Sequence, residues 1–571
     1  MNTRIAFAGL AAVLLAAVVA VAEPAIELKA VPGTVRVRQE QPFAGQDAAV
    51  IACARGEYES FQVVVTARGG LLKPCVAGMS TLRGESGAEV AEANITLYRV
   101  AYVPVRHSSP GATCPPGLTP DPLVPFKNPY TGEDVAQPVW RENGREGGRF
   151  GGNGFEVWPG QHQPVWVDVF VPRETPPGVY AGLFTVHAGD QRAQIPVELT
   201  VWGFTLPEGP THENHFGGFE RVAAYHKVEP GSEAFDLIED RYIAMLAEHR
   251  INPPLPRRLR PLVADDGAAI FDEATDAAIT EFVDRYHVTN IDVPRAPFGD
   301  VPGADRDKAL RFYRSWYDYL ERKGWARRAY VYMLDEPNDP DAYEQVRRLG
   351  ALVNEAAPGL RRLVVEQPYT QDPAWGALDG ALDIWCPLFG FVHEPSVQRV
   401  IAQGDDVWSY TALVQKAPPY HPEYETVKND LPPFWQVDYP VTSYRIPAWL
   451  NRRYGITGLL YWSTVYWGSP DRNPWDDPGF RIRWNGDGAL FYPGADAGID
   501  GPVASIRLKS LRDGMEDYEY FALLDARGGR DAVERIVRAA VPTWGSWQQD
   551  PYRLLELRAQ LAEEILKGQG E

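Results

Sequence analysis

The chain has 571 residues, of which 45% are hydrophobic and 12% aromatic, enough for more than one packed core. Lys and Arg number 56 against 76 Asp and Glu, giving a formal charge of -20 that repels phosphate backbones and anionic membranes. This charge argues against nucleic acid as a partner. A neutral carbohydrate is compatible with it, and the many aromatic rings can supply the flat apolar faces that line sugar sites.

The N-terminal segment is typical of a bacterial export signal. Arg4 precedes an apolar run over residues 5–19, and residues 20–22 (AVA) form a small-x-small cleavage site. A membrane anchor is the alternative, but the run is shorter than the roughly 20 residues of a spanning helix. We therefore expect residues 1–22 to be a signal peptide cleaved near Ala22, which gives a periplasmic or extracellular protein. No later segment is apolar enough for stable membrane insertion.

Residues 23–207 are predicted to form an all-β domain, a β-sandwich. Turn residues separate short β-rich runs, for example 61–66, 95–105, 165–171 and 195–201. Residues 107–164 are dense in Pro and Gly and look too irregular for several strands, which predicts a decorated loop or a lid.

After Pro207 the pattern changes to strand-like runs that alternate with amphipathic helices, which indicates an α/β fold with a parallel sheet. The candidate strands are 215–219, 255–262 (the weakest), 290–294, 329–334, 362–367, 382–388, 407–413 and 458–463. Eight such strands predict a (β/α)8 barrel over residues 208–503, with its active site at the C-terminal ends of the strands.

Residues 504–571 are predicted to be helical and to pack on the barrel. Leu508, Leu511, Met515 and Tyr518 recur at helical spacing and form one apolar stripe. The charged residues between them are expected on the wetter side of the helix, namely Arg512, Asp513, Glu516, Asp517 and Glu519.

The cysteines and histidines indicate no metal site. Cys53 and Cys75 are candidates for one disulfide in an oxidising compartment, and Cys386 lies in an apolar run typical of a buried, inert thiol. His212 and His215 are close in sequence but lack further ligands nearby. We expect neither a metal nor a cofactor.

The sharpest local feature is a pair of adjacent acids, Asp335 and Glu336, at the end of predicted strand four. Carboxylates at the C-terminal end of a barrel strand lie where catalytic groups usually lie. Capping of the next helix is the alternative role. However, Asp339 before Pro340 already provides an N-cap with a first-turn proline, so the pair has no structural task left.

Glycosidic cleavage needs one acid to protonate the leaving oxygen and a second group to stabilise or attack the anomeric carbon. Neighbouring side chains on a regular strand point to opposite faces, so both acids can serve one sugar only if the strand breaks or bulges. Pro337 favours such a break, because it cannot donate a ladder hydrogen bond. Two acids so close suit a shared task on one side of the sugar, which favours substrate assistance.

In that mechanism the sugar's own 2-acetamido oxygen attacks the anomeric carbon. One carboxylate holds the acetamido N–H, and the other acts as general acid and then as base. We expect an ionised Asp335 to favour the protonated form of the neighbouring Glu336, which is the form that a general acid needs. A conventional glycosidase with a distant nucleophile, such as Glu366 at the end of strand five, is the alternative mechanism.

The sequence also resembles glycoside hydrolase family 123, whose catalytic domain follows a β-sandwich, over nearly the whole mature chain. The shared motifs are 56–62 (GEYESFQ), 177–182 (PGVYAG), 334–337 (LDEP), 458–462 (GLLYW) and, most specifically, 505–520 (SIRLKSLRDGMEDYEY). The resemblance implies a retaining β-N-acetylgalactosaminidase fold. Within it, Asp335 matches the acetamido-orienting aspartate and Glu336 the acid/base.

Further residues are candidates for substrate binding. Aromatic rings near the ends of strands six to eight can stack on a pyranose, and we rank Trp462 and Tyr410 above Trp385, Trp408 and Tyr461. Each ring is alternatively a core residue, because alternation along a strand lets only some face a pocket. Polar candidates for sugar hydroxyls, for which a turn or an ion pair is the alternative, are Asn485, Asp487 and Arg507.

The leading hypothesis is a glycoside hydrolase that removes terminal β-linked N-acetylgalactosamine, or a related N-acetylhexosamine, from a glycan or glycoconjugate by substrate-assisted retaining catalysis. The alternative from another class is a non-catalytic polysaccharide-binding or cell-surface protein. The intact acid pair argues for the enzyme. The sequence makes no prediction of oligomeric state.

Overall fold

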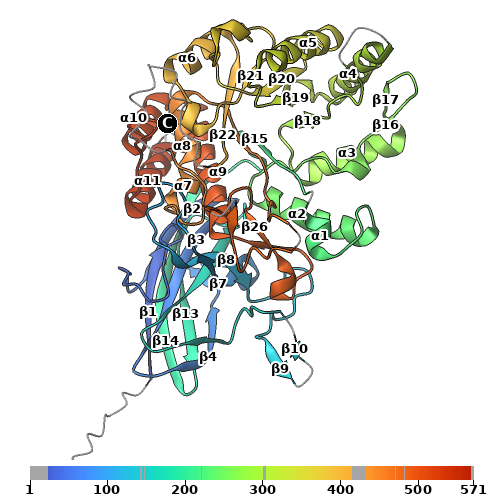
Figure 1. Cartoon of the computed structure of the whole chain (residues 1–571). Coiled ribbons are helices and arrows are strands. Elements are labelled where there is room, and N and C mark those ends of the chain that lie inside the picture. Colours follow the sequence, from blue (N-terminus) through green and yellow to red (C-terminus); the bar gives the residue numbers. More distant parts are fainter. Residues whose placement is uncertain are drawn as a thin grey trace, which may run out of the picture.

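A computed structural model describes residues 24–141, 144–146, 148–219, 221–299, 304–413, 432–469, 471–480 and 483–567. The predicted signal peptide lies outside these ranges. In Figure 1 the N-terminal sheets, in blue and teal, lie below a region where helices surround a parallel sheet. Within the described ranges, no helix combines the length and the hydrophobicity needed to cross a bilayer.

Two sheets, called here the N-terminal sheets, build the first part of the chain. The first is antiparallel, in the order β1 (Ala25–Pro32), β3 (Glu57–Arg68), β12 (His162–Val171), β7 (Ile95–Val105) and β8 (Gly117–Pro125). The second has the order β11 (Phe155–Val157), β4 (Leu72–Met79), β13 (Gly178–Ala188), β14 (Gln191–Thr205) and β2 (Ala49–Arg55), with β5 (Leu82–Gly84) and β6 (Glu89–Val90) at its side.

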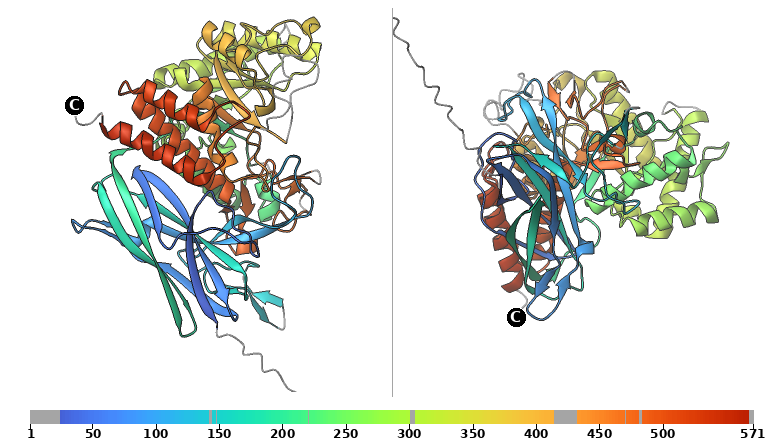
Figure 2. Two further views of the ribbon diagram at one scale, coloured as in Figure 1. Left: turned by 90° about the vertical axis from the view of Figure 1, so that its left-hand side faces the viewer. Right: turned by 90° about the horizontal axis from the view of Figure 1, so that it is seen from below.

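The first N-terminal sheet is buried on both faces. Val63 and Val65 of β3 pack with Val167 of β12 in a hydrophobic core that also contains residues of the second sheet. Residues at the alternate positions of the same strands point to the other face. Examples are Ser60 of β3 and Asp168 of β12, which are 4% and 1% exposed. That second buried face is where the C-terminal helices lie beside the sheet in Figure 2.

The stretch 107–164 contains strands, contrary to the sequence prediction. β8 pairs with β7 in the first sheet, and β9 (Val139–Arg141), β10 (Gly144–Glu146) and β11 lie further along the stretch. The prolines of β8 are tolerated because β8 is the edge strand of its sheet, where a missing N–H breaks no ladder.

The predicted disulfide between Cys53 and Cys75 does not form, and both thiols are free and buried. Cys53 lies on β2 and Cys75 on β4, and β13 and β14 separate these strands within the sheet. Three strand spacings of about 4.8 Å exceed the roughly 7 Å limit between Cα atoms of a disulfide.

A curled sheet of seven parallel strands forms the centre of the second part. Its order is β15 (Glu213–Phe216), β23 (Gly458–Tyr461), β22 (Asp406–Thr411), β21 (Ile384–Trp385), β20 (Arg361–Val365), β19 (Ala329–Asp335) and β18 (Ile291–Val293). The surrounding helices are α1 (Val222–His226), α2 (Glu233–Glu248), α3 (Glu273–Arg285), α4 (Ala304–Lys323), α5 (Pro340–Ala356), α6 (Glu394–Gln403), α7 (Thr442–Arg445) and α8 (Pro447–Tyr454).

The curled sheet is a half-barrel and not the complete (β/α)8 barrel that the sequence predicts. Predicted strand two does not form. In place of 255–262 the chain has a 3-10 turn at Arg257–Leu259 and a small hairpin of β16 (Leu262–Val263) and β17 (Ala269–Ile270). Pro253, Pro254 and Pro256 precede or interrupt this stretch, and each removes a donor that a central strand needs.

Asparagine side chains bridge the gap between β15 and β18. The Asn214 carbonyl accepts from Asn290 Nδ2 at 2.8 Å, and the Asn214 amide donates to Asn290 Oδ1 at 3.0 Å. Asn252, whose amide donates to Asn214 Oδ1 at 2.8 Å, also contacts Asn290. Side-chain amides thus supply hydrogen bonds that the backbone of a second strand would otherwise supply.

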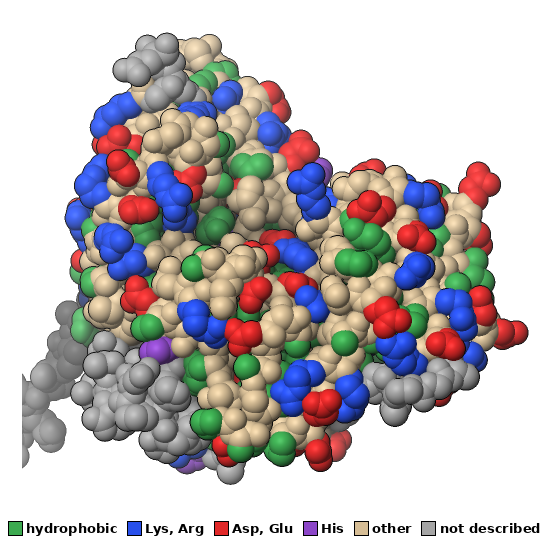
Figure 3. Space-filling view, turned by 90° about the horizontal axis from the view of Figure 1, so that it is seen from above, with side chains coloured by type: hydrophobic (Ala, Val, Ile, Leu, Met, Phe, Trp, Pro, Cys, Tyr) green, Lys and Arg blue, Asp and Glu red, His purple; other side chains and the backbone are tan. Residues whose placement is uncertain are grey.

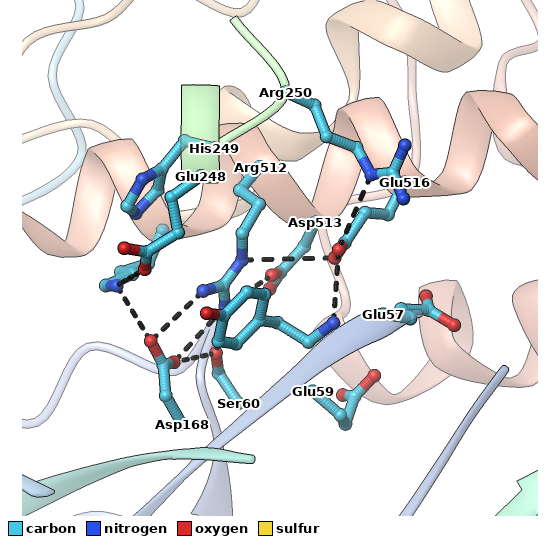
Figure 4. A network of polar contacts seen from close by, with 12 residues as sticks. Glu57, Glu59, Ser60, Asp168, Glu248, His249, Arg250, Arg512, Asp513 and Glu516 are labelled. Atoms are coloured by element: carbon cyan, nitrogen blue, oxygen red, sulfur yellow. Dashed lines mark hydrogen bonds and ion pairs between the residues drawn. The ribbon is translucent and has the colours of Figure 1, made fainter. Parts of the chain in front are cut away.

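The predicted wet face of the first C-terminal helix is buried. α9 (Ile506–Asp525) is followed by α10 (Arg530–Ala540) and α11 (Pro551–Lys567). Arg512, Asp513, Glu516, Asp517 and Glu519 of α9 are each 5% exposed or less, because the helix lies between the N-terminal sheets and the parallel sheet. Figure 4 shows Arg512 pointing to Asp168 and Ser60 of the first N-terminal sheet.

Candidate active site

The acid pair lies where β19 ends, and the strand is irregular there. Asp335 is the last residue of β19, and the pairing with β20 slips by one residue between Tyr332 and Leu334. Glu336 follows with φ of 41°, which places a non-glycine residue in the left-handed region. The bulge and the positive φ end the strict alternation of side chains, as the sequence argument required for both acids to serve one sugar.

Each acid is held by a tyrosine hydroxyl. Tyr332 Oη donates to Asp335 Oδ1 at 2.8 Å, and Tyr410 Oη donates to Glu336 Oε1. Burial, followed by the charge of the bound carboxylate, raises the pKa of both tyrosines well above 10, so both remain donors. Asp335 and Glu336 are themselves exposed, and no Arg or Lys forms an ion pair with either in the described ranges. Their oxygens are therefore accessible to a ligand.

Every second residue of the strands lines the inner face of the half-barrel. Tyr330, Val365, Ile384, Tyr410 and Leu460 belong to this inner cluster, one from each of five strands. Because Asp335 and Glu336 follow at the C-terminal end, the tyrosine-rich inner face forms the floor below them.

Two polar residues on the edge strands β15 and β18 extend this floor. His215 Nδ1 lies 2.7 Å from Tyr330 Oη and 3.9 Å from Asp292 Oδ2, and its ring lies 5.6 Å from that of Tyr332. Burial lowers the pKa of His215 and raises that of Asp292. From the sequence, His215 was a candidate only for metal binding, and Asp292 was not a candidate for any function. The rule that the C-terminal ends of strands carry functional groups finds neither, because His215 begins predicted strand one and Asp292 lies in the middle of predicted strand three.

Glu366 lies directly after β20 and is 4% exposed. Its Oε1 accepts a hydrogen bond from Tyr343 Oη at 2.9 Å. Burial raises the pKa of Glu366 to about 8, and the nearby charge of Glu336 adds to this rise. A nucleophile must be ionised, so these surroundings disfavour Glu366 in that role at neutral pH.

Trp462 is the one stacking candidate that is partly exposed at the C-terminal end of the sheet, directly after β23. Its Nε1 donates to Asp487 Oδ2 at 3.2 Å. Asp487 also accepts from the Leu413 amide and from Gln436 Nε2, each at 3.0 Å. Burial raises the pKa of Asp487 to about 7. Asp487 is 1% exposed, so it positions Trp462 and is not free to bind a sugar itself.

Three other aromatic candidates are misplaced for sugar binding. Trp385 and Tyr461 alternate with inward-facing residues and point outward, where Trp385 donates to Asp405 at 2.9 Å and Tyr461 accepts from the Gly488 amide at 2.6 Å. Trp408 faces inward, but it lies opposite Gly458 at the N-terminal end of the sheet and is fully buried.

Asn485 and Arg507 are also structural. Asn485 Nδ2 donates to the His107 carbonyl at 2.9 Å and to Ser109 Oγ at 3.0 Å, tying the stretch 107–164 to the second part of the chain. Arg507 is 1% exposed and pairs with Asp121 at 3.0 Å. Neither side chain is accessible to a substrate.

The described residues contain no group of three or more His, Cys, Asp or Glu arranged to hold a metal ion. Charges of both signs are interspersed over the face in Figure 3, so the net charge of -20 is not gathered there into one acidic patch. The arrangement offers two accessible acids, hydroxyl donors and a partly exposed indole, which suits a neutral, hydroxyl-rich ligand.

Comparison with known proteins identifies the class of this site. Residues 306–524, which include β19 and the acid pair, match the glycoside hydrolase 123 catalytic domain. This match agrees with the sequence resemblance to glycoside hydrolase family 123 and supports a glycosidase that acts on glycans. No curated protein sequence matches it significantly.

Solved structures support the fold. A family 123 glycoside hydrolase from Clostridium perfringens, described in terms of glycolipid glycan hydrolysis, is similar with a TM-score of 0.65 and 13% identity, over 95% of this chain and 98% of that one. A β-glucuronidase from Parabacteroides merdae matches 81% of this chain and 50% of its own, with a TM-score of 0.27 and 11% identity. The second likeness is too weak to support any inference.

Proposed function

We propose that this family 123 glycosidase removes terminal β-linked N-acetylgalactosamine, or a related N-acetylhexosamine, by substrate-assisted retaining catalysis. The observation that carries the proposal is the irregular end of β19, where a bulge and the positive φ of Glu336 free two adjacent acids from strict alternation. Adjacent acids on one side of a sugar suit an acetamido group that supplies its own nucleophile.

In the first step, Asp335 accepts a hydrogen bond from the acetamido N–H and makes the acetamido oxygen more nucleophilic. This oxygen attacks the anomeric carbon, the glycosidic bond breaks, and Glu336 gives its proton to the leaving oxygen. In the second step, Glu336 takes a proton from water, which attacks the anomeric carbon and reopens the oxazoline ring. The configuration at that carbon is inverted twice and so retained.

The tyrosines keep the two acids in separate roles. Tyr332 fixes Asp335 with its carboxylate available to the acetamido N–H, and Tyr410 donates to Glu336 and stabilises its ionised form after proton transfer. In this proposal Trp462 stacks on the pyranose, and His215 and Asp292 form hydrogen bonds with sugar hydroxyls.

The protein is also proposed to be exported, on the basis of the N-terminal apolar run and the cleavage site near Ala22. An exported enzyme meets its glycan outside the cytoplasm. The C. perfringens relative, described for glycolipid glycans, makes a lipid-linked or free amino-sugar glycan a reasonable first substrate to assay.

The test is release of the aryl group from an aryl β-N-acetylgalactosaminide, with the gluco epimer beside it. We expect turnover, inhibition by a thiazoline mimic of the oxazoline, and no turnover of the matched substrate that lacks the acetamido group. Full activity on that last substrate would overturn substrate assistance. Binding without turnover of any N-acetylhexosaminide would favour a non-catalytic binding protein.

A further inference from the structure

Two glutamates follow adjacent parallel strands at neighbouring positions. Asp335 pairs in register with Val365, so Glu336 and Glu366 are the next residues along β19 and β20. Neighbouring strands lie about 4.8 Å apart, which brings the two chain segments side by side. The Glu366 amide donates to the Val364 carbonyl at 2.9 Å, so the backbone turns directly at this residue.

The largest polar influences on the ionisation of Glu366 come from neutral hydrogen-bond donors. Tyr343 Oη from α5 donates to it at 2.9 Å, and the Gln367 and Gln371 side chains also donate. The charge of Glu336 also acts on Glu366 and raises its pKa. These donors stabilise a carboxylate once it forms, while burial and Glu336 keep it protonated to about pH 8.

We propose that Glu366 is a positioning residue that stores a proton beside Glu336 and returns it to Glu336 for protonation of the leaving oxygen. The inference rests on the proposed role of Glu336 as general acid. The transfer is balanced within the pair: an O–H bond breaks on Glu366, an O–H bond forms on Glu336, and the negative charge passes to Glu366. No outside acid is consumed.

In this arrangement the titrations of Glu336 and Glu366 are coupled to each other. Interacting acids lose their protons in steps that belong to the pair, and the second proton leaves at a higher pH than it would leave an isolated acid. An exposed glutamate alone loses its proton near pH 4.3. The proton stored on Glu366 therefore remains available for transfer to Glu336 up to mildly alkaline pH.

The first test is the pH dependence of kcat/KM in wild type, Glu366→Gln and Tyr343→Phe. Glu366→Gln removes the store, so its alkaline limb is expected to move to lower pH by at least about one unit, with activity retained at acid pH. Tyr343→Phe removes a donor that favours ionised Glu366, so its limb is expected to move the other way. An unchanged limb in both variants overturns the proposal. Loss of Glu366→Gln activity at every pH, with a covalent intermediate trapped on Glu366 of the wild type, overturns it in favour of a nucleophile.

A second measurement does not depend on turnover. In protein labelled with 13C-carboxyl glutamate, the resonance of Glu366 is expected to titrate near pH 8 and to be absent in Glu366→Gln. The resonance of Glu336, assigned by its absence in Glu336→Gln, is expected to show a second inflection near pH 8 in the wild type, because the two acids are coupled. That second inflection is expected to be lost in Glu366→Gln. Absence of any glutamate titrating above pH 7 overturns the store. Because this readout needs no substrate, it separates failure of the proton store from failure of the proposed reaction. Circular dichroism melts verify that each variant is folded.

Discussion

The molecule has two groups of acids that differ in their partners. The first group lies where α9 packs against the first N-terminal sheet, called here the α9 interface. There Asp168 pairs with Lys509 at 2.8 Å and with Arg512 at 3.0 Å. Burial alone raises the pKa of Asp168, but these two cations hold it well below its usual range. At the end of β19, Asp335 and Glu336 are exposed and accept hydrogen bonds from neutral tyrosines.

The difference shows how to separate structural from chemical acids. An acid whose charge is matched by buried Arg and Lys has no oxygen left for a substrate, and its loss leaves a cation unpaired in the interior. An acid held by a hydroxyl keeps a lone pair for a ligand and can change its protonation state. Charged residues are denser along the sequence of α9, yet the proposed chemistry lies at the end of β19, where charged residues are sparser.

The comparison is tested most strongly by Glu336→Gln. Loss of the proposed general acid is expected to lower kcat by about 10²–10⁴-fold on a substrate with a poor leaving group. The loss is expected to be smaller with a dinitrophenyl leaving group, which departs without a proton. Because Glu336 is exposed, its free energy of unfolding should change by less than about 0.5 kcal/mol. A large loss of stability with normal kcat would place Glu336 among the structural acids.

Arg512→Met is expected to have the opposite signature. It leaves Asp168 buried with one cation fewer, and the free energy of unfolding should fall by about 3–5 kcal/mol, as measured by urea titration. The matched control is Arg530→Met, because Arg530 is 74% exposed in its pair with Glu534 and should change stability by less than about 0.5 kcal/mol. Equal effects of the two variants would show that the α9 network adds no stability.

Tyr410→Phe tests whether the hydroxyl is part of the chemistry. A hydrogen bond to a charged group contributes about 1.5–3 kcal/mol, so kcat is expected to fall by about 10–100-fold with KM little changed. Tyr552→Phe on α11 is the control, since its ring is 38% exposed and outside the site. An unaltered kcat in Tyr410→Phe would contradict the assigned role of the tyrosine.

The α9 interface is also expected to be sensitive to acid through His249. Burial, with Lys509 and Arg512 nearby, lowers the pKa of His249 well below 6.5. The unfolded chain therefore takes up a proton below about pH 6.5 that the folded chain does not. The free energy of unfolding therefore decreases as the pH falls below 6.5, by up to about 1.4 kcal/mol per pH unit. Urea titrations between pH 7 and 5 should show a shallower fall in His249→Gln.

The control for this effect is His287→Gln, because the His287 side chain is 50% exposed. It should leave the pH dependence of stability as in the wild type. An equally steep acid loss in His249→Gln would assign the sensitivity to other groups.

Local patterns were sufficient to predict much of the parallel sheet. Seven of the eight predicted strands form, because each is an apolar run between helix signals. Strand two does not form, since its prolines remove backbone donors and asparagine side chains bridge the gap. No local pattern predicts such a bridge, because its partners Asn214, Asn252 and Asn290 are far apart in sequence.

The candidate site was predicted in its acids but not in its surroundings. Adjacent acids before a proline are a local feature, and so Asp335 and Glu336 could be singled out. The direction of each aromatic ring depends on strand register, which put Tyr410 inside and Trp385 outside. His215 and Asp292 come from strands that meet the site only when the sheet curls.

By itself the sequence determined the resemblance to family 123, the alternation of strands and helices, and the position of the acid pair at a strand end. All three depend on residues close together in the chain. The tertiary structure alone decided that the barrel is open, that the charged face of α9 is buried, and which tyrosine holds which acid. These features depend on desolvation and on contacts between distant segments, and periodicity along one segment cannot report what will cover its polar face.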